Sequence, residues 1–262
     1  MATKAKTDGG IVETIKTVIY ALLIAGLFRT LFFQPFWIPS GSMKDTLLIG
    51  DFLFVNKMAY GYSKYSCPFA LCPFSGRILF RAPVRGDVVV FRHPTQNTDF
   101  IKRLIGLPGD TVQVKGGVLF LNGQEVPQSP DGIFTETYEL QGPMGYPPRC
   151  ENGPVGEGGD CQSSRYVETL PGGRKHEILN IDQNGNADNT DVFTVPEGEY
   201  FFMGDNRDNS MDSRFSQARG GVGFVPADRL IGRADRVIFS SAGRSMLYFW
   251  TWRPDRFFKA VE

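Results

Sequence analysis

Two serines flank a single glycine in the segment WIPSGSMKDTLLIGD, residues 37–51. Ser40 and Ser42 could supply a nucleophile, but a serine attacks only when a neighbouring group takes its proton. Neither serine lies in a G-x-S-x-G turn, and the chain has two histidines. His93 precedes a proline and His176 lies in a polar stretch, so we expect both at the surface. A Ser-His-Asp triad is therefore disfavoured.

A lysine can serve as the base only if its pKa is lowered from about 10.4, which burial in apolar surroundings does. Lys102 lies in the apolar stretch DFIKRLIGLPGD, residues 99–110, and would share one strand face with Phe100 and Leu104. The alternative is a charge at a sheet edge, and spacing alone favours that alternative. The other lysines weighed for this role are expected in turns or at exposed positions: Lys57, Lys64, Lys115 and Lys175.

A third polar segment, MGDNRDNSMDSRF at residues 203–215, alternates acids and arginines after a glycine. Such a density of opposite charges in one loop suggests an ion-paired scaffold that fixes side chains, rather than a solvated face.

Composition limits the fold and the partners. The 262 residues are 42% hydrophobic and have a formal net charge of zero, which argues against nucleic acid as the main partner. The 30 glycines and 17 prolines favour many short strands over long helices. Strands are expected at 85–91, 99–110, 111–126, 198–205 and 229–240. The Gly-, Pro- and Asn-rich stretch 127–192 reads as a loop-rich insertion.

The sequence offers no metal motif. There is no HExxH, and the stretch 182–193 has Ala187 and Phe193 where a calcium loop needs Gly and Glu.

The four cysteines lack CxxC spacing and allow three pairings, among which sequence alone does not choose. Pairing by proximity would join Cys67 to Cys72 and Cys150 to Cys161 and would indicate an oxidising compartment. Free thiols in a reducing cell are the alternative.

The segment from Ile15 to Pro39 is long and apolar enough for one membrane-spanning helix. A cleaved signal peptide is the main alternative, but it should end in a small-x-small site. Arg29 and large aromatic residues follow instead, so a retained anchor is favoured. Basic residues on both sides leave the orientation open, and the cysteines favour an external domain.

Four blocks of this sequence together resemble bacterial type I signal peptidases, which are membrane-anchored serine endopeptidases. The blocks are PSGSM at 39–43, RGDVVVF at 85–91, FIKRLIGLPGD at 100–110 and GDNRDNSMDSR at 204–214. The resemblance implies a mainly β fold, in which antiparallel sheets form a catalytic domain with an inserted loop-rich β region after one transmembrane helix. The predicted divisions are 1–35 for the cytoplasmic N-terminus and anchor, 36–110 and 198–262 for the catalytic domain, and 111–197 for the insertion.

The same resemblance assigns site residues. It implies a Ser42–Lys102 dyad, with Ser40 and the Ser42 backbone N–H as the oxyanion hole. Ser210 would orient the lysine, and Asp212 and Arg214 would form a supporting ion pair. Substrate-binding positions are carried over by place in the blocks, with ordinary core residues as the alternative: Ile38, Met43, Leu47, Val90, Asp99, Phe100 and Ile101.

The implied function is cleavage of secretory preproteins after a small-x-small motif, without a cofactor or metal. The implied location is the bacterial inner membrane, crossed once, with the catalytic domain on the periplasmic face. Two departures affect the cleft: Asp45 stands where the family usually has proline, and SQARGGVG at 216–223 is inserted. Many members also have a second span, and we find one.

Two other functions share some of these features. A self-cleaving repressor resembles the family in its Ser/Lys core, but an apolar anchor occupies the place of its DNA-binding segment. A noncatalytic β domain that binds envelope partners is the second.

A final feature is the aromatic and basic stretch 245–258, which suits the membrane–water boundary, although core strands are aromatic too. We expect Trp250 and Trp252 to contact lipid.

Overall fold

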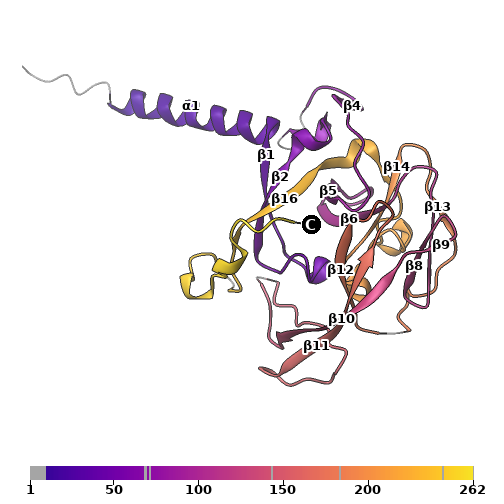
Figure 1. Cartoon of the computed structure of the whole chain (residues 1–262). Coiled ribbons are helices and arrows are strands. Elements are labelled where there is room, and N and C mark those ends of the chain that lie inside the picture. The colour runs from indigo at the N-terminus through magenta and orange to yellow at the C-terminus, as the bar shows by residue number, and fades with distance from the viewer. Residues whose placement is uncertain are drawn as a thin grey trace, which may run out of the picture.

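The computed structural model describes residues 10–67, 70, 72–142, 144–182, 184–243 and 245–261. A single long helix, α1 (Gly10–Leu31), leads into a body made of β-strands (Figure 1). The 22 residues of α1 include none that is buried. At 1.5 Å per residue the helix is about 33 Å long, enough to cross the hydrocarbon core of a bilayer. Within the described residues it is the one helix that meets this requirement.

The largest sheet is antiparallel, has seven strands and runs in the order β1-β2-β16-β5-β6-β14-β15. Its strands are β1 (Phe33–Trp37), β2 (Asp51–Asn56), β5 (Val88–Arg92), β6 (Asp99–Gly106), β14 (Glu199–Met203), β15 (Val225–Pro226) and β16 (Leu230–Ser240). Both ends of the chain therefore build one sheet, and β16 returns from the C-terminal part to lie between β2 and β5.

Three smaller antiparallel sheets complete the fold. One contains β13 (Phe193–Thr194), β7 (Thr111–Lys115), β8 (Val118–Leu121) and β9 (Gln124–Glu125); a second contains β10 (Gln128–Thr137), β11 (Asp160–Thr169) and β12 (Lys175–Asn180); the third pairs β3 (Tyr62–Ser63) with β4 (Arg77–Ile78). The described 3₁₀-helices are η1 (Gly41–Met43), η2 (Lys57–Ala59), η3 (Lys64–Ser66), η5 (Arg207–Asn209), η6 (Gln217–Arg219), η7 (Ala227–Arg229), η8 (Phe249–Thr251) and η9 (Pro254–Arg256).

These sheets confirm the predicted mainly β, antiparallel fold preceded by one apolar helix. The strands between the two parts of the large sheet lie in residues 111–194. The division of the chain into functional domains at the predicted boundaries stays a prediction, and residues 1–9 of the predicted N-terminal segment lie outside the described residues.

The proximity pairing of the cysteines is confirmed. Cys67 is bonded to Cys72, and Cys150 is bonded to Cys161. The second disulfide joins β11 to the segment that follows β10, so it fastens part of the insertion to its own sheet.

Three predicted exposures are wrong. His93 and His176 are 0% and 2% exposed, and Lys57 is 1% exposed. His93 packs 4.7 Å from the ring of Phe100, and its Nδ1 accepts hydrogen bonds from the next turn. His176 occupies an inward-facing position on β12, beside Glu168. The polar neighbours of His176 point outward on the same strand and therefore mislead, and the proline after His93 does not prevent burial of the ring.

Candidate active site

The nucleophile candidate lies in a loop that folds back onto the large sheet. Ser42 is in η1, between β1 and β2, and Lys102 is on β6. The loop is closed at its base because Ile38 N donates to Asp51 O, and Gly50 N donates to Ile38 O. This closure brings Ser42 Oγ to 2.6 Å from Lys102 Nζ, across 60 residues of sequence. The second acceptor of Lys102 Nζ is the carbonyl of Ile101, at 3.0 Å.

Lys102 is prepared to act as a base. Its side chain is buried, with 4% of the residue exposed. Burial lowers the pKa of Lys102 from 10.5 to about 8, and the charge of Arg214 acts in the same direction. The carboxylates of Asp212 and Asp205 oppose this shift. A pKa of about 8 leaves roughly a tenth of the lysines neutral at pH 7, so the amine can accept a proton from a serine hydroxyl.

Ser40 lies beside the nucleophile on the solvent side. Its Oγ is 3.5 Å from Ser42 Oγ, and the residue is exposed. Gly41 separates the two serines and is buried in η1. A hydroxyl in this place can turn toward a carbonyl that approaches Ser42, as the oxyanion-hole assignment requires.

The segment after β14 holds the nucleophile loop from the opposite side. Asn206 N donates to Ser42 O at 3.1 Å, and Asn206 Nδ2 donates to Gly41 O at 3.2 Å. Gly204 makes this approach possible. A Cβ at Gly204 would lie 2.5 Å from Ser42 O and 2.3 Å from Ser210 Oγ. Sequence reasoning missed Gly204 and Asn206, although both belong to the GDNRDNSMDSR block.

The supporting ion pair is present and buried. Arg214 Nη2 and Asp212 Oδ2 are 2.9 Å apart, and Gly204 N donates to the same carboxylate at 3.0 Å. Burial raises the pKa of Asp212, but the charge and hydrogen bonds of Arg214 outweigh it, so the net pKa lies below its usual value. Arg214 Nη2 also donates to Arg207 O at 2.5 Å. The pair therefore fixes both ends of this loop.

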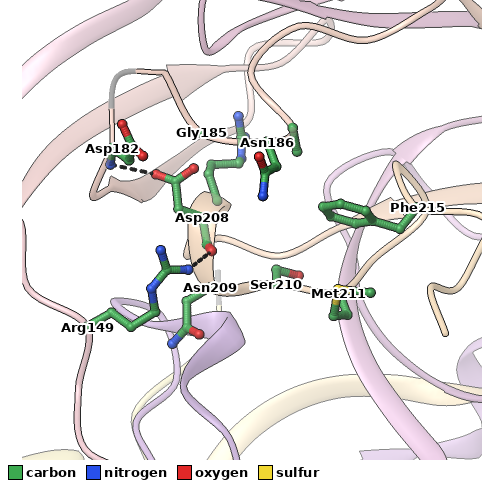
Figure 2. A pocket seen from close by; sticks show the side chains of 11 residues that line it. Arg149, Asp182, Gly185, Asn186, Asp208, Asn209, Ser210, Met211 and Phe215 are labelled. Atoms are coloured by element: carbon green, nitrogen blue, oxygen red, sulfur yellow. Dashed lines mark hydrogen bonds between the residues drawn. The ribbon is translucent and has the colours of Figure 1, made fainter. Parts of the chain in front are cut away.

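Ser210 is buried in the same loop, at the wall of a cavity of about 330 Å³. Figure 2 shows it between Asn209 and Met211, with Gly185 and Asn186 across the cavity. Its buried hydroxyl has no hydrogen-bond partner among the described residues, and the hydrogen bonds of Lys102 go to Ser42 and Ile101. The predicted role of Ser210 in orienting Lys102 stays a prediction.

The predicted substrate-binding residues divide into two groups. Five of them belong to one buried cluster under the nucleophile loop: Ile38, Met43, Leu47, Val90 and Ile101. Asp99 and Phe100, on the outer part of β6, are half-buried, and Asp99 pairs with Arg92 at 2.8 Å. The cluster forms the floor beneath Ser42, and its use as a pocket stays a prediction.

The inserted stretch 216–223 folds back onto the active-site loop. It contains η6, and Val222 N donates to Asp212 O at 3.1 Å. Val222 is fully buried, so the insertion adds packing behind Asp212. Among the described residues, no three His, Cys, Asp or Glu side chains are grouped to hold a metal ion.

Comparisons with known proteins define the class. A family model described as "Signal peptidase, peptidase S26" matches residues 11–239, so the chain belongs to this family of serine peptidases. A signal peptidase I from Rickettsia akari (strain Hartford) is 39% identical over 248 residues, which cover 91% of this chain and 84% of that protein. One from Rickettsia typhi (strain ATCC VR-144 / Wilmington) is 38% identical over 245 residues, covering 90% and 83%.

A crystal structure of a signal peptidase I from Enterococcus faecalis V583 also matches. It is 27% identical and covers 58% of this chain and 97% of that chain, with a TM-score of 0.31. The family assignment rests on the family model and the Rickettsia proteins. The chain is accordingly a serine endopeptidase of the signal peptidase I type.

Proposed function

We propose that this protein removes N-terminal signal peptides from exported preproteins after a small-x-small motif, by a Ser42–Lys102 dyad. The observation that carries the proposal is the 2.6 Å hydrogen bond between the Ser42 hydroxyl and a buried lysine whose pKa is lowered to about 8. Family membership supplies the class of reaction and substrate.

The mechanism follows from these atoms. Neutral Lys102 takes the proton of Ser42 Oγ as the oxygen attacks the scissile carbonyl carbon. The resulting oxyanion accepts hydrogen bonds from Ser40 Oγ–H and the Ser42 backbone N–H, and one such donor is worth about 3 kcal/mol of barrier. Protonated Lys102 then gives its proton to the leaving amine, which is the new N-terminus of the mature protein. An ester remains between Ser42 Oγ and the signal peptide.

Hydrolysis of the ester repeats the same steps. Lys102 takes a proton from water, and the hydroxide adds to the ester carbonyl. Collapse returns the proton to Ser42 Oγ and releases the signal peptide with a free carboxylate. The half-buried edge of β6 at Asp99 and Phe100 would meet the residues before the cut, and their size would be limited by the packed floor beneath Ser42.

The direct test uses the full chain in detergent and a preprotein with an Ala-x-Ala site. Cleavage should yield one new N-terminus immediately after that motif, read by N-terminal sequencing of the product. The Ser42→Ala variant should give no product while it keeps the wild-type thermal midpoint. Cleavage by folded Ser42→Ala, or a product cut elsewhere, would reject the assigned nucleophile or the assigned specificity.

We further propose that α1 crosses the inner membrane once and leaves the catalytic body on the periplasmic face. The exposed apolar surface of α1 supports insertion, and the two disulfides favour an oxidising side. Three threonine hydroxyls of α1 each donate a hydrogen bond to the backbone carbonyl four residues earlier, so they would not be left without a partner in lipid: Thr14, Thr17 and Thr30.

The C-terminal aromatic segment, residues 245–258, would lie at the lipid surface. Leu247 and Trp250 are 85% and 69% exposed. In the view of Figure 1 this segment and α1 leave the body on the same side, at the left. Trp252 is partly exposed, at 41%, but it also packs edge-on against Phe239, with the ring centroids 5.0 Å apart. Leu247→Ser with Trp250→Ser should slow cleavage of a membrane-inserted preprotein and leave a short soluble peptide unaffected. Equal losses on both substrates would contradict lipid contact.

A further inference from the structure

The loop that carries Ser42 is restrained from three directions. Asn206 holds the backbone on one side, as described above. On a second side, Arg256 pairs with Asp51 at 2.6 Å and donates to Thr46 O at 3.0 Å. The third restraint comes from the hairpin formed by β10 and β11, which belongs to the insertion. Its attachment point is Lys44, two residues after the nucleophile.

Lys44 is only 3% exposed, and its ammonium has a complete set of acceptors. Nζ lies 2.7 and 2.6 Å from the two carboxylate oxygens of Glu136, and 2.8 Å from Gln141 Oε1. Gln141 Nε2 in turn donates to Glu136 at 2.6 Å. The three N–H groups of an ammonium are thus matched by three oxygens. This lysine is committed to the hairpin and is not available as a second base.

The stem of Lys44 reaches the glycine between the two serines. A Cβ at Gly41 would lie 3.2 Å from Lys44 Cε and 3.4 Å from Cδ, so the stem packs directly against that residue. Gly41 joins Ser40, the assigned oxyanion donor, to Ser42, whose N–H is the other donor. A displacement of the lysine stem would therefore move both donors together.

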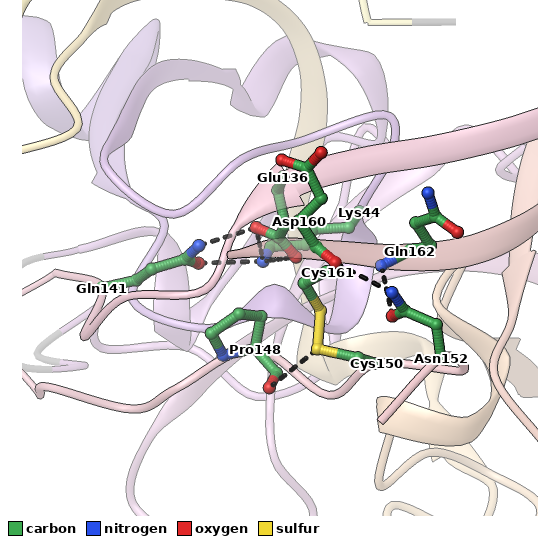
Figure 3. Close-up of a disulfide and its surroundings, with 9 residues drawn as sticks. All are labelled: Lys44, Glu136, Gln141, Pro148, Cys150, Asn152, Asp160, Cys161 and Gln162. Atoms are coloured by element: carbon green, nitrogen blue, oxygen red, sulfur yellow. Dashed lines mark hydrogen bonds and ion pairs between the residues drawn. A yellow bond between two sulfur atoms is a disulfide. The ribbon is translucent and has the colours of Figure 1, made fainter. Parts of the chain in front are cut away.

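The hairpin end of this contact is itself held in place. Glu136 lies opposite Cys161 in the register of β10 and β11, and Cys161 is bonded to Cys150. Figure 3 shows Lys44, Glu136 and Gln141 grouped beside this disulfide. The neighbouring pair, Asp45 with Arg165 at 3.2 Å, is partly exposed and contributes less. Asp45 also replaces the proline expected at this position, whose ring would have restrained the loop.

We propose that Lys44 and Glu136 are positioning residues, which hold Gly41 so that the Ser40 hydroxyl and the Ser42 N–H converge on the oxyanion. The inference rests on the proposed function. The insertion thereby acts on catalysis through one partly buried ion pair, although it contributes neither the nucleophile nor the base. Because the donors act on the transition state, loss of the pair should lower kcat far more than it raises KM.

The experiment measures kcat and KM of the full chain on a preprotein for wild type, Lys44→Met, Glu136→Gln and Lys44→Arg. Lys44→Met keeps an apolar stem and should lower kcat by about 10- to 100-fold with KM changed less than about threefold, since small displacements of catalytic groups have costs of this order. Glu136→Gln should lower kcat by a smaller factor, and Lys44→Arg should restore part of it. Lys175→Met, at an exposed site of the insertion, is the matched control and should behave as wild type.

A double-mutant cycle separates positioning from general destabilisation. Ser40→Ala should reduce the effect of Lys44→Met, because the donor that the lysine positions is then already absent. The pH midpoint of kcat/KM should stay at the wild-type value in every variant, since Lys102 is untouched. If Lys44→Met does not fold, the Glu136→Gln kinetics and its cycle with Ser40→Ala decide the question.

Three results would overturn the proposal: a folded Lys44→Met or Glu136→Gln variant with wild-type kcat, a loss confined to KM, or full additivity with Ser40→Ala. A wild-type chain that fails to cleave any preprotein would overturn the proposed function as well. A cleaving wild type with unaffected variants would overturn the positioning role alone.

Discussion

Two buried lysines in this molecule have the same lowered pKa and different surroundings. Lys57 and Lys102 are 1% and 4% exposed, and burial is the main reason that the pKa of each falls to about 8. Lys102 Nζ donates to a hydroxyl, Ser42 Oγ, at 2.6 Å. Lys57 Nζ donates to a backbone carbonyl, Ser66 O, at 2.5 Å. The lowered pKa is common to both lysines, so the difference lies in the partner atom. A hydroxyl can give its proton to a neutral lysine, whereas a carbonyl has no proton to give.

The surroundings of Lys57 are those of a structural junction. Its backbone N donates to Phe32 O at 3.0 Å, directly after α1, and Tyr62 Oη donates to Leu31 O at 2.7 Å. Ser63 and Ser66 form a reciprocal capping box at η3. The lysine thus ties the end of the helix to the first strands of the body, whereas Lys102 lies on a central strand under the nucleophile loop.

The largest expected difference between the two lysines is in catalysis. Lys102→Met should lower cleavage by about 1,000-fold or more, because it removes the amine that contacts Ser42 Oγ and is the proposed base. Lys57→Met should keep activity on a soluble peptide within about threefold of wild type. Steady-state cleavage of one peptide by both variants, with thermal midpoints to verify folding, makes the comparison.

The pH profile tests the same difference. For wild type and Lys57→Met, kcat/KM should rise about tenfold per pH unit below 8 and level off above it, since the active form holds neutral Lys102. An unchanged profile in Lys102→Met would remove this residue as the base. A large loss in folded Lys57→Met would show that the two sites are coupled.

In stability the two lysines should behave alike. The folded pKa of each is below the unfolded value of 10.5, so between pH 8 and 10 the unfolded chain binds more protons. Stability attributable to either lysine therefore rises with pH across this window, and the protonated form costs about 3 kcal/mol below it. Each Met variant should show a flatter rise from pH 8 to 10 in denaturant-unfolding free energy. If the slope of unfolding free energy against pH changes in only one variant, the two lysines do not contribute to stability in the same way.

The predicted base, Lys102, is buried beside Ser42, whereas Lys57, which was expected at an exposed position, is buried as well. Strand alternation puts Lys102 on one face with Phe100 and Leu104, but this pattern alone favours a sheet-edge charge, and the resemblance to signal peptidases supplied the assignment. The burial of Lys57 comes from contacts of η2 with α1 and β16, which no local sequence pattern indicates. The glycine and proline content predicted many short strands, and the resemblance to signal peptidases implied that they form antiparallel sheets.

Close contacts between segments that are far apart in the sequence also could not be predicted from local patterns. The role of Gly204 depends on how near the Ser42 carbonyl passes, which is a distance between segments more than 150 residues apart in the chain. No local pattern indicates the contacts of Lys44, because its acceptors, Glu136 and Gln141, lie in the insertion. Long-range pairs of this kind need the fold before they can be seen.

The smallest expected effect concerns the serines that accompany the two lysines. Ser66→Ala removes the bond from Ser63 N to Ser66 Oγ but keeps the carbonyl that accepts from Lys57. Loss of one such bond at a cap should cost about 1 kcal/mol of folding free energy and leave cleavage unchanged. Ser42→Ala should lower cleavage and keep the folding free energy near wild type. Its hydroxyl bonds to the proposed base, Lys102, and the variant keeps the Ser42 carbonyl that accepts from Asn206 N. Denaturant unfolding and peptide cleavage of both variants give the four values needed. Loss of activity in a stable Ser66→Ala variant would mean that the structure around Lys57 affects the active site. It would contradict the purely structural role of Lys57.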